Sequence, residues 1–293
     1  MAIALAVLGL GFLMARNNWL GSLNNHLFEK KSTRESSIDD SLIFSPTLTP
    51  VPTLASTPTP KPLIFAEMNQ LYGPCVYVPT LMYHHVQDLD QARAEGSMAL
   101  TVFPDIFREQ MEYLRTQGYM TITMSDLISF FDQNIPLPKK SVILTFDDGY
   151  DDFASNAFPI LKEYGFKATV FIVTGLIENK GYLTWEQAQE MARDGSILFA
   201  NHTWSHHNVG TDKEIIEREI TLADTQLGEH GLNNPKTFSY PHGLSGNLAE
   251  ESLTSKGYTL AFTNKQGLIL CRQKRFELPR IRIGNTSLKS YSL

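Results

Sequence analysis

From about residue 76 onward, stretches with the apolar pattern of a strand alternate along the chain with stretches that have the apolar pattern of a helix. Short apolar runs rich in β-branched and aromatic residues are typical of buried strands, whereas apolar residues three or four positions apart are typical of one helix face. The pattern predicts strands at 78–83, 120–124, 141–146, 168–173, 196–200, 236–240, 259–263 and 278–283. It predicts helices at 103–118, 125–131, 153–164, 185–193, 213–230 and 249–256, the fourth opened by a capping box at 184–187.

Strands that alternate with helices indicate an α/β fold with a mostly parallel sheet. We expect a distorted (β/α) barrel of about seven strands. In such a barrel the loops that follow the strands gather on one face. Polar segments at 84–85, 147–148, 201–207 and 240–243 all follow predicted strands, so we expect them to meet there.

The chain begins with a different pattern. Residues 2–15 are an unbroken apolar run followed by Arg16. This run is short for a membrane span of about 20 residues, and no Lys or Arg precedes it as in a signal peptide. We expect residues 1–20 to be a membrane anchor or signal, which places the protein outside the cytoplasm, membrane-anchored or secreted. A buried helix of the folded domain is the weaker alternative, because a long polar tract follows.

Residues 21–70 are polar and then rich in Pro and Thr, with six of the 15 prolines between residues 45 and 62. Proline lacks an amide donor and fixes φ, so we expect an extended, disordered linker here. Residues 71–293 then form the compact domain.

Charge and cysteine content narrow the class further. The net charge is −6 and no basic run stands out, so we expect no nucleic-acid partner. The two cysteines, Cys75 and Cys271, lie at the two ends of the predicted domain. They form a disulfide or are two unrelated buried thiols, and two isolated cysteines do not make a zinc site.

Two adjacent carboxylates end the apolar run 141–146. Asp147 and Asp148 are followed by Gly149. Successive side chains of a strand point to opposite faces, so both carboxylates serve one site only where the strand bends, and glycine permits such a bend. Asp-Asp-Gly is also ordinary turn chemistry at a strand end.

A histidine pair follows the predicted strand 196–200. His202 and His206 are four positions apart, a spacing that also occurs by chance on surfaces. Together with a carboxylate from the Asp-Asp strand they would form a ligand set suited to Zn²⁺ or a similar divalent metal, with positions open for water and substrate. We expect His207 to be a neighbour and not a ligand.

The segments T-F-D-D-G-Y at 145–150 and H-T-W-S-H at 202–206 resemble motifs of the polysaccharide deacetylases with a NodB-type domain, carbohydrate esterase family 4. The resemblance covers residue 76 to the C-terminus. It implies that Asp147 is the catalytic base and that Asp148, His202 and His206 hold the metal. The metal expected first is Zn²⁺, with Co²⁺ and Ni²⁺ as alternatives.

A third family motif reads R-P-P-Y-G, and residues 239–243 correspond to it. Ser239 stands at the arginine position and His242 at the tyrosine position. The resemblance implies that the His242 backbone amide stabilises an oxyanion, with Tyr240 as a neighbouring substrate contact. Arg280 is the candidate to orient Asp147 in place of the missing arginine, and a structural salt bridge explains Arg280 equally well.

The family's last motif, L-x-H near the C-terminus, is absent there, and Met82-Tyr83-His84 is a similar triplet on the first strand. This arrangement resembles a permuted subgroup that includes deacetylases of poly-N-acetylglucosamine. It implies that His84 is the general acid and His85 a structural neighbour. The alternative is that both are core histidines with satisfied hydrogen bonds.

The sequence therefore predicts a metal-dependent N-deacetylase of a polysaccharide that contains N-acetylglucosamine, either a free polymer or the glycan of peptidoglycan. An O-acetyl-xylan-type esterase and a small-amide amidase on the same scaffold are the enzymatic alternatives. A non-catalytic glycan-binding module is the alternative from another class. The intact Asp147 argues against that module, because binding needs no base.

Overall fold

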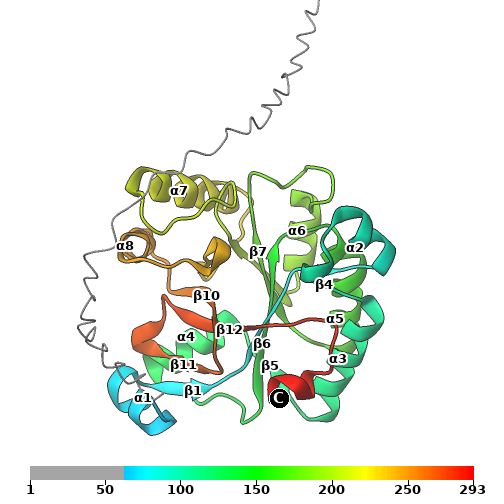
Figure 1. Ribbon diagram of the computed structural model, residues 1–293. Helices are drawn as coiled ribbons and strands as arrows, with labels where there is room; N and C mark the ends of the chain where they lie inside the picture. Colours follow the sequence, from blue (N-terminus) through cyan, green and yellow to red (C-terminus); the bar gives the residue numbers. More distant parts are fainter. Residues whose placement is uncertain (1–62) are drawn as a thin grey trace, which may run out of the picture. The chain divides into compact units, whose positions relative to one another are not determined.

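The predicted barrel is confirmed. A computed structural model of the protein describes residues 63–293, in which seven parallel strands form a ring in the order β2-β12-β10-β9-β8-β7-β6, closed by pairing between β2 and β6 (Figure 1). The ring strands are β2 (Thr80–Tyr83), β6 (Ser141–Asp148), β7 (Ala168–Ile172), β8 (Ile197–Asn201), β9 (Thr237–Ser239), β10 (Leu260–Gln266) and β12 (Leu278–Arg282). The ring is distorted, because β8 and β9 pair only at Asn201 and Phe238 and the register shifts between β10 and β12.

Helices surround the strands (Figure 1). They are α1 (Phe65–Tyr72), α2 (Leu89–Glu95), α3 (Pro104–Thr116), α4 (Met124–Gln133), α5 (Phe158–Tyr164), α6 (Trp185–Ala192), α7 (Lys213–Glu229) and α8 (Asn247–Ser255). Short strands β3 (His85–Val86), β4 (Thr101–Val102) and β5 (Met120–Thr121) lie outside the ring, and a π-helical turn (Phe153–Ala157) precedes α5.

The capping box at Thr184 is confirmed, and a second one corrects a prediction. The helix predicted from residue 125 is α4, which begins at Met124 with Thr123 as its N-cap. The Thr123 side chain accepts from the Asp126 amide while the Asp126 side chain accepts from the Thr123 amide. This reciprocal pair satisfies two backbone donors at once, so the helix begins one residue earlier and the preceding strand is shorter than predicted.

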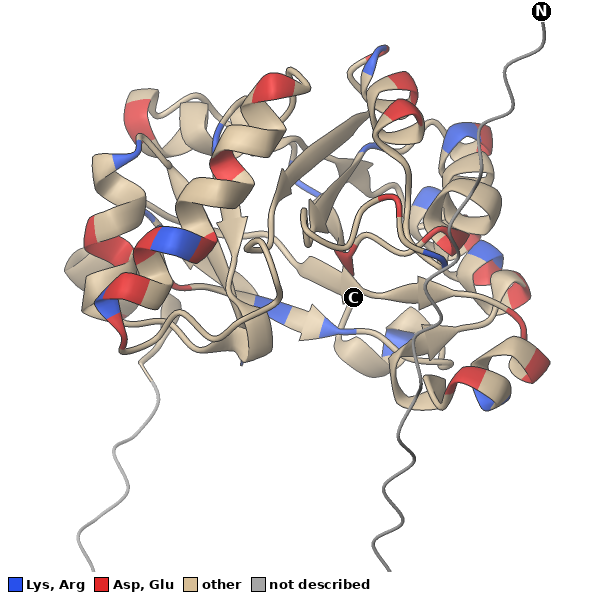
Figure 2. Cartoon of the chain, turned by 90° about the horizontal axis from the view of Figure 1, so that it is seen from above, with Lys and Arg blue, Asp and Glu red and all other residues tan. Residues whose placement is uncertain are grey.

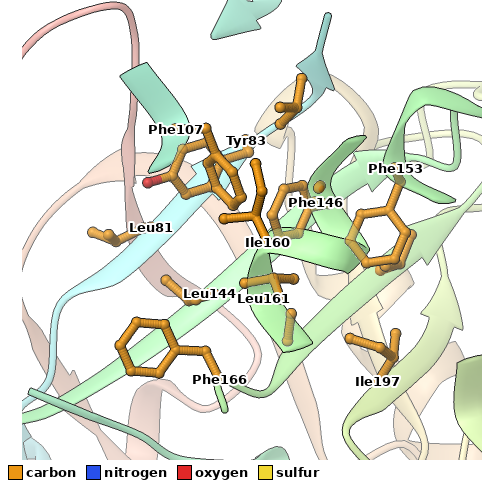
Figure 3. Packing of buried hydrophobic residues seen from close by; sticks show 14 of the residues in the cluster. Leu81, Tyr83, Phe107, Leu144, Phe146, Phe153, Ile160, Leu161, Phe166 and Ile197 are labelled. Carbon is orange, nitrogen blue, oxygen red and sulfur yellow. The ribbon is translucent and has the colours of Figure 1, made fainter. Parts of the chain in front are cut away.

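Strand β6 separates two hydrophobic clusters because its side chains alternate between the faces of the barrel wall. Leu144 and Phe146 pack with helix residues outside the ring (Figure 3), and Val142 belongs to the same cluster. Ile143 packs inside the ring with Phe171 and residues of other strands. The inner face of β6 therefore continues from Ile143 to Thr145 and Asp147.

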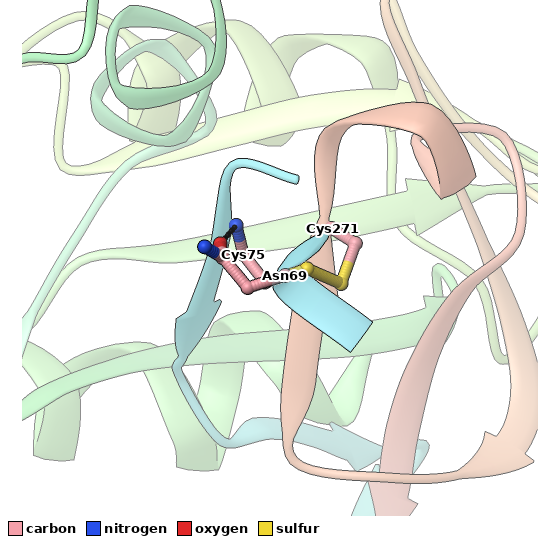
Figure 4. The surroundings of a disulfide bond; sticks show 3 residues. All are labelled: Asn69, Cys75 and Cys271. Carbon is pink, nitrogen blue, oxygen red and sulfur yellow. Dashed lines mark hydrogen bonds between the residues drawn. A yellow bond between two sulfur atoms is a disulfide. The ribbon is translucent and has the colours of Figure 1, made fainter. Parts of the chain in front are cut away.

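Cys75 and Cys271 are not two unrelated thiols. They lie on two antiparallel strands, β1 (Cys75–Tyr77) and β11 (Ile269–Cys271). Cys75 and Cys271 lie opposite each other in this pair and form a disulfide (Figure 4). Helix α1 packs beside them, and the Asn69 side-chain oxygen accepts from the Cys75 amide at 2.7 Å. The predicted domain start at residue 71 falls inside this helix.

The anchor predicted at 1–20 and the linker up to residue 62 lie outside the described residues. No helix within 63–293 has the length and apolar content that a membrane span needs. Lys and Arg are interspersed with Asp and Glu on the surrounding helices (Figure 2), which agrees with the absence of a basic run in the sequence.

Candidate active site

A cleft of about 570 Å³ opens where the barrel strands end at their carboxyl termini. The eight residues predicted to form the site all line it: His84, Asp147, Asp148, His202, His206, Tyr240, His242 and Arg280. A smaller cavity of about 210 Å³ near the start of β8 is lined, among the described residues, by no ionisable side chain. The larger cleft is therefore the candidate active site.

The register of the strands brings the two motifs together. Asp148 lies opposite Ile172 of β7, and Ile172 lies opposite Asn201 of β8. His202 is the next residue along the chain, so it lies at the level of Asp148. The two segments that carried the family resemblance thus meet at one edge of the barrel.

The bend that lets both carboxylates face the cleft lies at Asp148 itself as well as at the glycine. The φ angle is +75° at Asp148 and +80° at Gly149. A Cβ atom on Gly149 would lie 2.8 Å from the Ile172 side chain, so glycine is required on both counts. Because the alternation of the strand breaks here, Asp147 points inward and Asp148 joins it at the same site.

Asp148, His202 and His206 form a group that could hold a divalent metal. Oδ1 of Asp148 lies 3.5 Å from Nε2 of His202 and 3.3 Å from Nε2 of His206. Tetrahedral ligands about 2.0–2.2 Å from an ion are about 3.3–3.6 Å apart, so the spacing fits. Oδ1 of Asp148 is buried and has no hydrogen-bond partner among residues 63–293, which is consistent with a ligand atom.

The two histidines of the group differ in protonation. Burial and the neighbouring His202 lower the pKa of His206 to about 4, so this imidazole is neutral near pH 7. Burial acts to lower the pKa of His202, but the Asp147 and Asp148 carboxylates outweigh it and raise the pKa above its ordinary value. Burial acts to raise the pKa of Asp148, but the adjacent imidazoles outweigh it and hold the pKa well below its ordinary value.

Each histidine has a defined place. Nδ1 of His202 donates to the Ser239 carbonyl at 2.7 Å, which directs Nε2 toward Asp148. His207 is exposed and is not part of the three-residue group, as expected.

Asp147 is held by the guanidinium of Arg280. Nη1 and Nη2 of Arg280 donate to the two carboxylate oxygens at 2.7 Å each. The remaining three N–H donors of Arg280 reach Thr145, Ser239 and the Thr263 carbonyl. Burial acts to raise the pKa of Asp147, but the Arg280 charge outweighs it, and the net shift is downward. Asp147 is therefore ionised and fixed in orientation.

Ser239, at the family's arginine position, explains how Arg280 reaches this place. Its hydroxyl accepts from Nη2 of Arg280 at 2.8 Å and lies 3.4 Å from the Asp147 carboxylate. A small side chain on β9 leaves room for the guanidinium that comes from β12.

His84 and His85 separate into two environments. His84 lies in the cleft, and burial lowers its pKa although Asp147 and Asp148 act in the opposite direction. His85 stacks on Tyr150 at 3.6 Å between ring centroids, and its Nδ1 lies 2.5 Å from Oδ2 of Asp152. His85 is therefore a core histidine whose ring is hydrogen-bonded by Asp152.

The turn at His242 is strained and braced. The φ angle of His242 is +58°, and the Asn264 side chain donates to the His242 carbonyl at 2.9 Å. A Cβ atom on Gly243 would lie 2.0 Å from Oδ1 of Asn264, so this contact needs glycine. Tyr240 is buried beside the turn, and burial raises the pKa of its phenol.

Backbone strain gathers at the site. Eight non-glycine residues among those described have positive φ. Three of them, Asp148, His206 and His242, line the cleft, and a fourth, Thr203, lies in the loop between His202 and His206. Such conformations persist where the surrounding structure over-determines them, as at functional sites.

Two further residues hold loops of the site: Asn264 donates to the His242 carbonyl, and Glu219 accepts from the Ser205 amide. Asn264 lies on β10, and Glu219 lies on α7. Neither belongs to a motif, so only their three-dimensional contacts identify them.

Comparisons with known proteins agree with this geometry. The sequence profile of the polysaccharide deacetylase family matches residues 134–261. YxkH of Bacillus subtilis, named as a polysaccharide deacetylase, is 31% identical over 209 residues, which cover 70% of this chain and 71% of YxkH. The poly-β-1,6-N-acetyl-D-glucosamine N-deacetylase of Escherichia coli K12 is 28% identical over 258 residues. That match covers 72% of this chain but 37% of the E. coli protein.

A solved structure is similar as well. The Streptococcus pyogenes deacetylase PplD, in complex with acetate, superposes with a TM-score of 0.68 at 29% identity, covering 74% of this chain and 97% of PplD. With this fold, this Asp-His-His group and these relatives, the chain belongs to the polysaccharide deacetylase family.

Proposed function

We propose that the protein is a metal-dependent hydrolase that removes N-acetyl groups from a polysaccharide containing N-acetylglucosamine. The observation that carries the proposal is the pairing of Asp147 with Arg280 directly beside the Asp148–His202–His206 group. An oriented, ionised carboxylate next to a metal-binding group provides a base where water would be activated. A glycan-binding module has no need of this arrangement.

Zn²⁺ is the metal that we propose first, with Co²⁺ and Ni²⁺ as alternatives; when bound, it would lower the pKa of water and polarise the acetyl carbonyl. Asp147 would accept the proton of the attacking water, and Arg280 would keep its carboxylate in place. The backbone amide of His242 would donate to the developing oxyanion.

His84, which lines the same cleft and directly follows the strand β2 beside β6, would complete the reaction. As the C–N bond breaks, its protonated imidazole would donate to the departing amine nitrogen, which is otherwise a poor leaving group. Burial lowers the pKa of His84 and so makes its protonated form a stronger acid. The products are acetate and a free glucosamine unit.

The substrate that we propose to test first is poly-β-1,6-N-acetylglucosamine. Its support is the name of the E. coli relative and that of a Staphylococcus epidermidis relative, which is 26% identical over 232 residues. Chitin oligomers and the glycan of peptidoglycan are further substrates of the same chemical class.

The test is acetate release by the Zn²⁺-loaded protein from these three substrates and from acetylated xylan. We expect acetate and free amine in equal amounts from at least one N-acetylglucosamine polymer. Acetate from acetylated xylan without any free amine elsewhere would indicate an esterase. Metal binding without turnover on any of the four would indicate a glycan-binding module.

We also propose that the protein works outside the cytoplasm, with residues 1–20 as membrane anchor or signal and the segment from residue 21 to the start of α1 as linker. The Cys75–Cys271 disulfide supports this location, because such bonds persist in oxidising compartments. We expect protease added to intact cells to digest the domain if the cells have no outer membrane. For cells with an outer membrane, spheroplasts are used instead. Full protection until the cells are lysed would contradict the proposal.

A further inference from the structure

One buried carboxylate on α7 holds the loop that carries His206. Oε2 of Glu219 accepts from the Ser205 amide at 2.8 Å, and Oε1 accepts from the Ser205 hydroxyl at 2.9 Å. The main-chain carbonyl of Glu219 also accepts from the Trp204 amide at 3.1 Å. Three hydrogen bonds from a single helix residue therefore fix the two residues that precede His206.

The two histidines of the group are anchored differently. His202 directly follows β8, and its ring donates to the Ser239 carbonyl, so the barrel wall fixes it. His206 lies four residues farther along a loop and has a φ angle of +60°, a conformation that needs support from its surroundings. Ser205 is adjacent in sequence, so its bonds to Glu219 determine where His206 lies.

Packing does not explain a glutamate at this position of α7. Its side chain is 0% exposed, among buried positions of the helix that are otherwise apolar, such as Ile216, Ile220 and Ala223. Its cationic neighbour is Arg218, 3.2 Å away and 55% exposed. A buried carboxylate is costly unless its oxygens are bonded, so its bonds to the loop account for its presence.

We propose that Glu219 is a positioning residue of the metal site, which acts through Ser205 to place Nε2 of His206 against Asp148. The inference rests on the proposed role of His206 as a metal ligand. Groups that orient a ligand from behind in this way typically change metal affinity about 10–100-fold when they are substituted.

The test compares the Zn²⁺ affinity of Glu219→Gln with that of the wild type, measured by competition with a chromogenic chelator. We expect binding about 10–100-fold weaker in Glu219→Gln. Glu217→Gln is the matched control, because Glu217 lies on the same helix and pairs with Lys256 at 2.9 Å. This control should bind Zn²⁺ within about twofold of the wild type, as expected for a surface pair.

Ser205→Ala is the second variant, and it keeps the test valid if Glu219→Gln does not fold. It removes the hydroxyl bond alone, so we expect a loss of about fivefold, the value of one hydrogen bond. Thermal unfolding of the metal-free variants checks that the fold is intact. The Co²⁺ absorption spectrum of Glu219→Gln should differ from that of the wild type, because a displaced imidazole changes the ligand field.

Zn²⁺ affinities within about twofold of the wild type in both folded variants would overturn the inference. The measurement needs no substrate, so it is separate from the test of deacetylation. If the wild type binds Zn²⁺ but releases no acetate, the proposed function fails. The role of Glu219 is then decided by the Zn²⁺ affinities of the variants alone. If the wild type binds no Zn²⁺, both fail.

Discussion

Asp147 and Arg280, 133 residues apart in the chain, meet inside the barrel in a two-point contact with both N–O distances at 2.7 Å. The planar guanidinium matches the planar carboxylate, so the contact fixes orientation as well as charge. This contact links the strand that carries the Asp-Asp pair to the last strand of the ring.

Arg280→Lys should lower turnover about 10²-fold, because an ammonium cannot make the same two-point contact and a small displacement of the base is costly. Zn²⁺ content should stay unchanged. Ser239→Ala, which removes one of the other bonds of Arg280, is the control and should have a smaller effect. Unchanged turnover in Arg280→Lys would favour a purely structural salt bridge.

Local patterns in the sequence predicted most of the strands and helices, because each depends on residues close together in the chain. The four-residue spacing of His202 and His206 and the adjacent pair Asp147-Asp148 are visible without a structure. The resemblance to a known family added the role of Asp147 as base and the assignment of Asp148, with His202 and His206, to the metal. These parts needed no knowledge of which distant strands pair.

Long-range pairing could not be predicted in the same way. The closure of the ring between β2 and β6 and the β1–β11 pair depend on register across many residues. From the sequence alone, Arg280 could therefore either orient Asp147 or form a purely structural salt bridge. In the same way, Cys75 and Cys271 could be a disulfide or two unrelated thiols. The bracing of Ser205 by Glu219 has no signal in the sequence, since buried carboxylates on helices are recognised only by their contacts.

Zn²⁺ affinity should fall about tenfold for each pH unit between about pH 6 and pH 5. His202 has a raised pKa and is protonated in this range in the metal-free protein, so Zn²⁺ must displace one proton. His206, with a pKa of about 4, is already neutral there. Titration by chelator competition at several pH values checks this. A fall of about a hundredfold per unit would mean that both histidines release protons.

His84→Ala should retain Zn²⁺ and lose most of its turnover, because the departing amine then lacks a proton donor. A general acid must be protonated, so the rate should fall as pH rises through its pKa, and burial places this limb at lower pH than for an exposed histidine. The pH profile of kcat/KM measures it. A basic limb that persists unchanged in His84→Ala would assign the acid to another group.

Replacing both Cys75 and Cys271 by serine should lower the free energy of unfolding by about 2–5 kcal/mol, because the bond closes a loop across 196 residues. Neither cysteine lines the cleft, so Zn²⁺ content and turnover at low temperature should be unchanged. Denaturant unfolding of the oxidised wild type and the double variant gives the difference. Equal stability would mean that the paired strands and α1 hold this edge without the bond.

The central claim is that two adjacent carboxylates have different tasks, Asp147 as base and Asp148 as metal ligand. The direct test is to measure bound Zn²⁺ and acetate release together in Asp147→Asn and Asp148→Asn. We predict full Zn²⁺ and about 10²–10⁴-fold lower turnover in Asp147→Asn, because an amide cannot accept the proton. In Asp148→Asn we predict weak Zn²⁺ binding, with part of the activity restored at high Zn²⁺ concentration. Zn²⁺ lost from Asp147→Asn and retained by Asp148→Asn would reverse the assignment, and unchanged turnover in Asp147→Asn would contradict the mechanism.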